Sequence, residues 1–143
     1  MHQPEQQQRI EQAAAIPVRR NRATGRLEVL LIRRVGGGEW GIPKGHIDPG
    51  FSHAQAAAME AHEEAGVVGD VDEKPLGSFS YEKNGTAYAV QVFALRVTQT
   101  QPHWKEEAER ERQWFDADEA AGKVGREAVG RMIRKLGVKM EDR

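Results

Sequence analysis

The spacing of hydrophobic positions along the chain predicts an alternation of strands and helices. Strands are expected at residues 13–20, 26–34, 75–82, 87–97 and 113–115. The continuous apolar run at 29–32 is typical of an interior strand, and the turn-like residues 21–25 favour a hairpin between the first two strands. Asn84-Gly85 is a strong signal for a tight hairpin turn between the next two strands.

The first helix has clear signals at both ends. Ser52 and Gln55 have the spacing of a capping box, so the helix is expected to begin at His53. Gly66 stands where a left-handed C-cap belongs. Two more helices are expected near the C-terminus, a short one at 116–124 and a longer one at 126–136.

The order of these elements indicates one α/β domain with a mixed sheet covered by helices. We expect this domain to span residues 10–143, after a loose, Gln-rich arm at 1–9. Residues 35–50 carry six glycines and two prolines, and a loop of this length and composition is usually functional. Residues 98–112 form a polar, charged connector before the last strand.

Composition excludes several kinds of function. The net charge is −1, with 21 basic and 22 acidic residues, so no global field favours nucleic acid or a membrane surface. The chain has no cysteine, which excludes disulfides, thiol catalysis and Cys-type zinc sites. We see neither a signal peptide nor a stretch of about 18 apolar residues that would span a membrane. A soluble cytoplasmic protein is therefore expected.

Glu60, Glu63 and Glu64 crowd one face of the first helix, where like charges repel by about 0.2–0.5 kcal/mol per pair. A solvated charged stripe is one interpretation. The alanine-rich sequence upstream favours another, because small side chains let the helix backbone lie close to a neighbouring element. The glycine-rich loop and a helix N-terminus at Ser52 suit a phosphate group. The pattern predicts a divalent cation such as Mg²⁺, shared between carboxylates and substrate phosphates.

This segment resembles the Nudix box, G-x5-E-x7-R-E-U-x-E-E-x-G-U, where U is aliphatic. The box positions matched in register are Gly45, Glu60, Glu63, Glu64, Gly66 and Val67. The preceding WGIPKG is also similar to Nudix proteins. The sequence ERERQWFDADEA, residues 109–120, resembles members near the diphosphoinositol polyphosphate phosphohydrolases. The resemblance extends over roughly residues 13 to 136 and is strongest at 40–67.

Three box positions depart from the pattern. Phe51 replaces the first Glu, Met59 replaces the Arg, and Ala61 is small for the aliphatic position. In the family, the Arg orients the metal-binding carboxylates. A Phe51–Met59 contact would brace the helix in place of the lost charges, since sulfur–aromatic contacts are favourable. The alternative is a decayed box with weak or no catalysis.

The resemblance implies a Nudix-like α/β/α sandwich with a central mixed sheet. It also implies a Mg²⁺-dependent hydrolase, with Mn²⁺ as a substitute, that cleaves a phosphoanhydride bond in a polyphosphorylated small molecule. A diphosphoinositol polyphosphate and a dinucleoside polyphosphate are the two substrate classes considered. The alternative function is a non-catalytic Nudix-like module that binds a nucleotide or phosphometabolite. Neither function requires nucleic acid or a membrane as a partner.

Roles for individual residues follow from the same resemblance. The predicted metal ligands are Glu60, Glu63, Glu64 and the carbonyl of Gly45. Glu63 is the predicted general base, with Glu64 as the alternative. The predicted substrate-binding cations are Lys44, Arg33 and Arg34, because Lys and Arg side chains bind phosphate. The polar connector holds four candidates for a further metal ligand or general base, which are Glu106, Glu107, Glu109 and Glu111.

Overall fold

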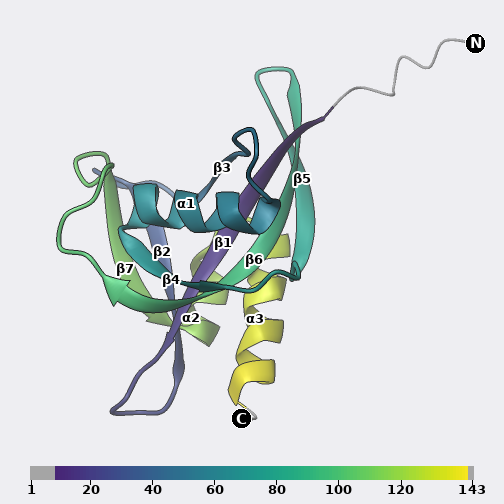
Figure 1. Ribbon diagram of the computed structural model, residues 1–143. Helices are drawn as coiled ribbons and strands as arrows, with labels where there is room; N and C mark the ends of the chain where they lie inside the picture. The colour runs from purple at the N-terminus through teal and green to yellow at the C-terminus, as the bar shows by residue number, and fades with distance from the viewer. Residues whose placement is uncertain (1–8, 142–143) are drawn as a thin grey trace, which may run out of the picture.

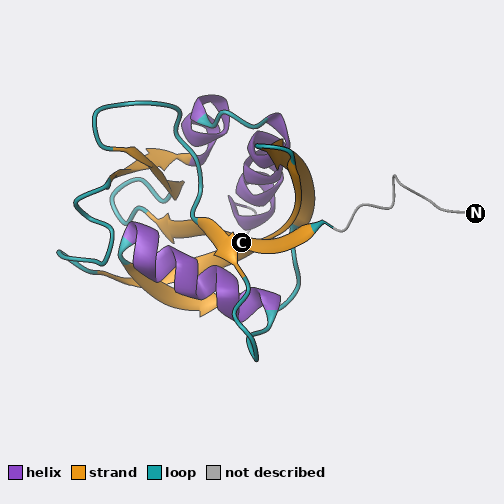
Figure 2. Cartoon of the chain, turned by 90° about the horizontal axis from the view of Figure 1, so that it is seen from above, coloured by secondary structure: helices purple, strands orange, loops and turns teal. Residues whose placement is uncertain are grey.

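The computed structural model describes residues 9–141, which form one mixed sheet of seven strands with helices on both faces (Figure 1, Figure 2). The strands are β1 (Ile10–Arg20), β2 (Leu27–Arg34), β3 (Lys44–His46), β4 (Val67–Val71), β5 (Gly77–Lys83), β6 (Thr86–Thr100) and β7 (Arg110–Asp116). The helices are α1 (His53–Ala65), α2 (Ala117–Lys123) and α3 (Glu127–Glu141). The strand order is β4-β6-β1-β2-β7, while β3 pairs with β1 and β5 with β6. Only the β1–β6 pair among these is parallel.

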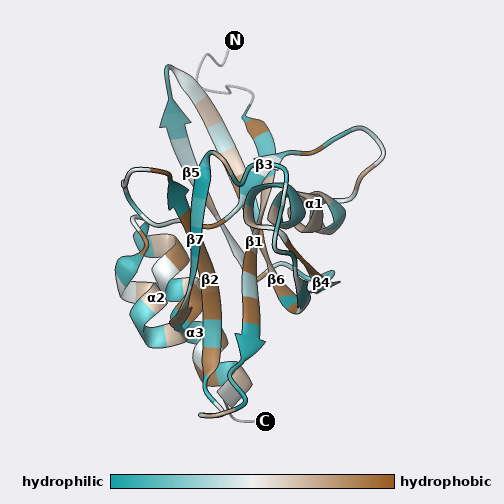
Figure 3. Cartoon of the chain, turned by 90° about the vertical axis from the view of Figure 1, so that its left-hand side faces the viewer, coloured by the Kyte–Doolittle hydropathy of each residue, from teal (hydrophilic) through white to brown (hydrophobic). Residues whose placement is uncertain are grey.

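Strand β1 lies at the centre and is buried on both faces. Because side chains alternate along a strand, Ala13 and Ala15 face α1, whereas Ala14 and Ile16 face α2 and α3. Figure 3 shows the apolar strands between α1 on one side and the other two helices on the opposite side. The sandwich architecture expected from the sequence is therefore confirmed.

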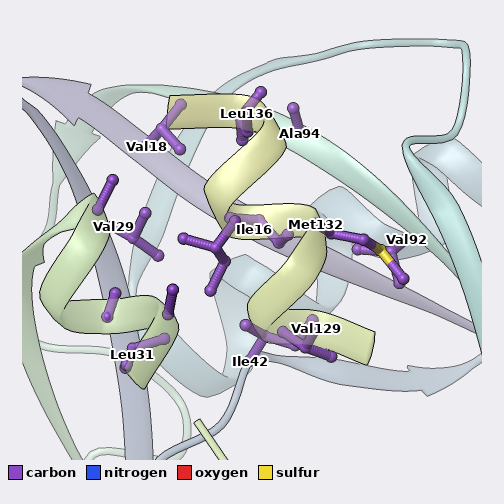
Figure 4. Close-up of a cluster of buried hydrophobic side chains, with 14 of the residues drawn as sticks. Ile16, Val18, Val29, Leu31, Ile42, Val92, Ala94, Val129, Met132 and Leu136 are labelled. Atoms are coloured by element: carbon purple, nitrogen blue, oxygen red, sulfur yellow. The ribbon is translucent and has the colours of Figure 1, made fainter. Parts of the chain in front are cut away.

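The two faces of the sheet hold different cores. On one face, α3 packs Val129, Met132 and Leu136 against apolar side chains of β1 and β2 (Figure 4). On the other face, α1 contributes mainly alanines, which are Ala54, Ala56, Ala57, Ala61 and Ala65. Small side chains let α1 lie close to the sheet, as the sequence predicts. This close approach brings the acidic end of the helix against the strands.

Several local predictions are confirmed. Strands β1 and β2 form an antiparallel pair. The Ser52 hydroxyl accepts a hydrogen bond from the Gln55 N–H, and the Gln55 side chain caps the Ser52 N–H in return. Gly66 adopts the left-handed conformation with φ of 69°. Asn84 and Gly85 both have positive φ in the turn between β5 and β6.

Other predictions need correction. The loop 35–50 contains the short strand β3, and residues 67–71 form β4, which lacks a hydrophobic pattern strong enough to predict it. Strand β1 begins three residues earlier than expected, at Ile10, because it pairs along its length with β6. The connector is shorter than predicted, since β6 runs to Thr100 and β7 starts at Arg110.

The sequence also made predictions for the two ends of the chain. Helix α3 continues beyond the predicted end at 136, to Glu141. The predicted N-terminal arm falls almost entirely on residues outside those described. Within residues 9–141, no helix is both long and apolar enough to cross a lipid bilayer.

Candidate active site

The three glutamates at the end of α1 have different surroundings. Glu64 is 8% exposed, and its Oε1 accepts a hydrogen bond of 3.3 Å from the main-chain N–H of Lys44. Glu60 is half-buried. Glu63 is also half-buried and lies 3.6 Å from the Nζ of Lys105. A solvated charged stripe does not describe this turn, because two of its carboxylates turn towards the sheet.

Glu60 and Glu64 act as a pair. Burial raises the pKa of both carboxyl groups, and it raises the pKa of Glu64 to about 8. Their side chains hydrogen-bond to each other across one turn of helix, which further raises the pKa of Glu64. Two carboxylates that hydrogen-bond to each other do not both ionise readily without a cation.

Gly45 on β3 lies directly against this pair. A Cβ atom at position 45 would overlap the Glu60 carboxylate, so with a larger residue there Glu60 would have to leave its present position. The segment around Gly45 is held in place by β1, with Ala13 opposite Gly45 in the antiparallel pairing. The glycine at the first box position therefore has a direct steric reason in this fold.

The donor set at this point suits a hard divalent cation. Glu60 and Glu64 offer carboxylate oxygens, and Gly45 brings main-chain atoms to the same place. Mg²⁺ is usually held by one or two carboxylates together with waters and substrate phosphates, so two converging carboxylates are sufficient. Among the residues that the structure describes, no three acidic or histidine side chains are already gathered around one point.

A cavity of about 320 Å³ opens beside Glu64, and we call it the main cavity because it borders the acidic turn, although larger hollows lie elsewhere on the molecule. Its lining residues are Ile32, Arg34, Gly37, Gly38, Glu39, Gly41, Ile42, Lys44, Glu64 and Arg110. Three of the charged side chains are cations. Arg34 and Arg110 occupy opposite positions on neighbouring strands β2 and β7, where like charges are unfavourable unless an anion lies between them.

Lys44 borders the main cavity from β3. Burial lowers the pKa of its ammonium group, and the nearby positive charge of Arg126 lowers it further. The Lys44 side chain lies 5.1 Å from the ring of Tyr81. The structure therefore places Lys44 at a site where positive charge is concentrated and partly shielded from water.

Arg33 and Arg34 point in opposite directions, because they are neighbours on a strand. Arg34 lines the main cavity, whereas Arg33 does not. The Arg33 guanidinium lies 3.3 Å from Glu111 and 4.3 Å over the ring of Trp40. The structure thus brings Arg34 and Lys44 to Glu64 and leaves Arg33 on the other side of β2.

The connector between β6 and β7, together with the start of β7, braces the acidic turn by donating hydrogen bonds to main-chain carbonyls at the end of α1. Trp104 donates its indole N–H to the Glu64 carbonyl at 3.0 Å. Arg112 donates to the carbonyl of Ala65 at 2.9 Å, and its guanidinium stacks 3.9 Å over the Trp104 ring. These bonds satisfy carbonyls that the end of a helix would otherwise leave without partners.

The structure also separates the four glutamates of the predicted connector, of which Glu111 lies in β7. The Glu106 carboxylate pairs with Arg110 at 3.0 Å. The main-chain N–H of Glu106 donates to the main-chain carbonyl of Glu63 at 3.1 Å. Glu107 pairs with His103, and Glu109 is exposed. Glu111 accepts hydrogen bonds from Arg33 and from the Gly36 N–H. Glu106 is therefore the one of the four that lies nearest the acidic turn.

Phe51 and Met59, which replace two charged residues of the box, lie outside the two hydrophobic cores. Phe51 is 37% exposed. The bracing contact between them stays a prediction. A guanidinium nevertheless reaches the acidic turn from β7, since Arg110 lies 3.9 Å from Glu64.

Sequence reasoning gave little weight to several residues that the structure brings to the site. Arg110 is one, because only the β2–β7 register places it opposite Arg34. Glu39, from the glycine-rich loop, and Arg126, at the predicted start of the last helix, are others. No periodicity in the sequence marks these positions, since their proximity arises from strand pairing.

Comparison with known proteins supports the family that the box residues resemble. Residues 9–136 match the model of the NUDIX domain. Over 125 residues the chain is 31% identical to Nudix hydrolase 12, mitochondrial, of Arabidopsis thaliana, covering 82% of this chain and 62% of that protein. Over 84 residues it is 33% identical to diphosphoinositol polyphosphate phosphohydrolase 2 of Rattus norvegicus, covering 57% of this chain and 45% of that protein. The chain thus spans about half to three-fifths of the length of these relatives.

A solved structure shows the same fold. The crystal structure of C. elegans Ap4A hydrolase superposes with a TM-score of 0.73 at 23% identity, covering 93% of this chain and 99% of that chain. The match to the NUDIX domain runs through every strand and all but the end of the last helix. The chain therefore belongs to the Nudix family.

Proposed function

We propose that this chain is a Mg²⁺-dependent hydrolase, with Mn²⁺ as a substitute metal, that cleaves a phosphoanhydride bond in a polyphosphorylated small molecule. The observation that carries the proposal is the position of Glu64. Its carboxyl group pairs with Glu60 on α1 and also lines the main cavity, where three of the other four charged side chains are cations. An acidic pair at the edge of a cationic cavity suits a metal shared between protein and phosphate.

Glu60, Glu64 and the carbonyl of Gly45 would hold the metal. When bound, a divalent cation polarises phosphoryl oxygens and lowers the pKa of a coordinated water. The buried position of the acidic pair keeps these carboxylates close together before the metal arrives, because the helix and β3 fix them from two sides. Glu63 stays a predicted ligand, and its pairing with Lys105 leaves it at the rim of the site.

The cations of the main cavity would orient the phosphates. Arg34, Lys44 and Arg110 approach from three different strands, so they are suited to contact successive phosphate groups and to stabilise the charge that develops during cleavage. A water oxygen attacks one phosphorus, the bridging P–O bond breaks, and the leaving phosphate takes the electron pair. Glu63 stays the proton acceptor expected from the resemblance, and Glu64 is the alternative that the cavity favours, because Glu64 lines the main cavity and Glu63 does not.

The connector between β6 and β7 and the start of β7 support the catalytic function over the non-catalytic alternative. Phe51 and Met59 remove two charged box residues, but Trp104, Arg112 and Arg110 hold the acidic turn from the opposite side. We infer that this brace does the positioning that the box arginine does in other members.

The test is hydrolysis of a panel of phosphoanhydrides in the presence of Mg²⁺, with the phosphorylated products separated and identified by chromatography. The panel includes a diphosphoinositol polyphosphate, a dinucleoside polyphosphate and a nucleoside diphosphate sugar. Turnover by the wild type, with a loss of about 100-fold or more in Glu64→Gln, would support the proposal. Ligand binding without turnover of any substrate would favour the non-catalytic module.

A further inference from the structure

A surface groove of about 870 Å³ lies between α3 and residues 72–76, which connect β4 to β5 (Figure 1). Among the residues that the structure describes, none lines both this groove and the main cavity. The groove also lies beside α3, on the face of the sheet opposite to α1 (Figure 3). A partner bound in the groove would therefore leave the acidic turn accessible to substrate.

Apolar side chains form the centre of the groove. Met132 and Leu136 are buried and lie one turn apart on α3 (Figure 4). Pro75 is exposed and Leu76 is half-buried on the opposite wall. Val138 is 66% exposed, more than any other large apolar side chain within residues 9–140. Exposed apolar surface that is bordered by polar side chains is typical of a protein interaction site.

Both walls of the groove are held in place by the fold. The Asp72 N–H donates to the Ala94 carbonyl at 3.0 Å, and the Leu76 N–H donates to the Val92 carbonyl at 2.7 Å. Strand β6 thus fixes both ends of the connection, while α3 is fixed by its buried face against the sheet. A preformed groove binds a partner at a low cost in ordering entropy.

Four cations border the apolar surface. Lys74 comes from the connection, and Arg134, Lys135 and Lys139 come from α3; all four are exposed. Among residues 9–140, no carboxylate oxygen lies within 4.0 Å of any of these cations. Lys135 and Lys139 are one turn apart, where like charges repel unless an anion lies near both.

The acidic side chains of the groove do not balance these cations. Asp72 pairs with Arg96 at 3.0 Å, which leaves Glu73 as the one acidic lining residue without an ion pair among residues 9–140. The whole chain has a net charge of −1, so the excess of positive charge is local to this groove. Electrostatic complementarity therefore favours an anionic partner.

We propose that this groove is a docking site for an acidic segment of another protein, in which apolar side chains are flanked by Asp and Glu. The apolar side chains would contact Leu76 and Val138, and the carboxylates would pair with the bordering cations. A second copy of this chain fits less well, because a symmetric contact would bring the lysines of the two copies together. A nucleic acid or a flat lipid surface would leave the apolar centre of the groove unfilled.

The direct test is selection of short peptides from a random displayed library on the wild-type protein, followed by fluorescence anisotropy of the most enriched peptide. Enriched sequences should combine Leu, Ile or Phe with Asp and Glu, and their affinity should fall as salt is added. The proposal would be overturned if no peptide were enriched, or if the enriched peptides lacked acidic residues.

Two charge reversals on α3 distinguish the groove from a general attraction of acidic peptides. Lys135 and Arg131 are both exposed, but only Lys135 lines the groove. Lys135→Glu should weaken binding of the enriched peptide about fivefold, whereas Arg131→Glu should stay within about twofold of wild type. Equal effects of the two reversals would overturn the proposal.

The apolar part of the groove has its own pair of variants. Val138→Asp places a carboxylate in the groove and should weaken the peptide about tenfold. Val35→Asp makes the same change at a position that is 57% exposed and lies outside the groove, so it should bind the peptide like wild type. Melting temperatures show whether both variants are folded. Unchanged binding by folded Val138→Asp would contradict the proposal.

The other occupants give different results. Tighter binding to phosphatidylserine vesicles or to single-stranded DNA than to any enriched peptide would contradict an acidic protein segment. Sedimentation would contradict it as well if the wild type formed a dimer that Val138→Asp separates. A monomeric wild type that binds the peptide more tightly than vesicles or DNA is the result that the proposal predicts.

Discussion

The indole N–H of Trp104 donates a hydrogen bond of 3.0 Å to the main-chain carbonyl of Glu64. This bond ties the connector between β6 and β7 to the residue that lines the main cavity. Trp104→Phe keeps most of the apolar surface and removes the donor. We expect a loss of about 1 kcal/mol in the free energy of unfolding and a severalfold fall in kcat. Urea denaturation and steady-state kinetics measure both.

Trp114→Phe is the control for that experiment. Trp114 packs against the core on the α1 side, and its ring carries Arg19 at 4.0 Å. Its substitution should leave kcat close to that of wild type. If Trp104→Phe also leaves kcat and stability unchanged, the brace has no role in positioning Glu64.

Metal binding is tested without any substrate. Mg²⁺ at saturating concentration should raise the melting temperature of the wild type by about 5 °C or more, because a ligand that binds the folded state stabilises it. Glu60→Gln and Glu64→Gln should lose most of this increase. Glu119→Gln, at an exposed position on α2, should keep it. An equal increase in all four proteins would place the metal elsewhere.

The raised pKa of Glu64 predicts how stability depends on pH. Between its ordinary value of 4.5 and about 8, the unfolded chain releases the Glu64 proton while the folded protein retains it. Without metal, the free energy of unfolding should therefore fall as pH rises through this range. Mg²⁺ needs the deprotonated carboxylates, so its stabilising effect should be larger at pH 8.5 than at pH 6. Thermal melts with and without Mg²⁺ at both pH values test this, and a metal effect independent of pH would contradict it.

Gly45→Ala should separate metal binding from folding. The added Cβ meets the flexible end of the Glu60 side chain, which can move aside, so the metal-free protein should lose little stability. The displaced carboxylate should no longer bind metal, and the Mg²⁺-induced increase in melting temperature should disappear. Gly122→Ala, in open space on α2, should keep that increase and gain about 0.5–1 kcal/mol in stability. A normal metal response in Gly45→Ala would rule out this geometry.

Arg33 and Arg34 should differ in effect although they are neighbours. Arg34→Met removes a cation from the main cavity and should raise KM about tenfold. Arg33→Met removes the contacts to Glu111 and Trp40, so it should lower stability with little change in KM. Steady-state kinetics of the two variants measures the change in KM, and denaturation measures the change in stability. A larger rise in KM for Arg33→Met would show that the phosphates bind on the other side of β2.

Much of the fold was predictable because its signals are local. The capping box of Ser52 and Gln55 predicts the start of α1, and Asn84-Gly85 predicts a turn that needs positive φ. The short strands β3 and β4 were not predictable, since three to five residues carry too little periodicity. They are held by pairing with β1 and β6, which are distant in sequence.

The site was predictable only in part for the same reason. The spacing of Glu60 and Glu64 on one helix identifies the acidic turn, and Gly45 follows from the box pattern. The cations of the site depend on strand register instead. Arg110 meets Arg34 through the β2–β7 pairing, and Arg126 reaches Tyr81 only when the chain has folded. Arg33 shows the limit most clearly, because one residue along a strand reverses the direction of a side chain.

The most direct test of the central claim is phosphate release from a diphosphoinositol polyphosphate, followed over time with Mg²⁺, with EDTA, and with Glu64→Gln in place of wild type. The account predicts turnover by the wild type with Mg²⁺, and a loss of about 100-fold or more in each of the other two conditions. Equal rates with and without metal, or full activity in Glu64→Gln, would contradict it.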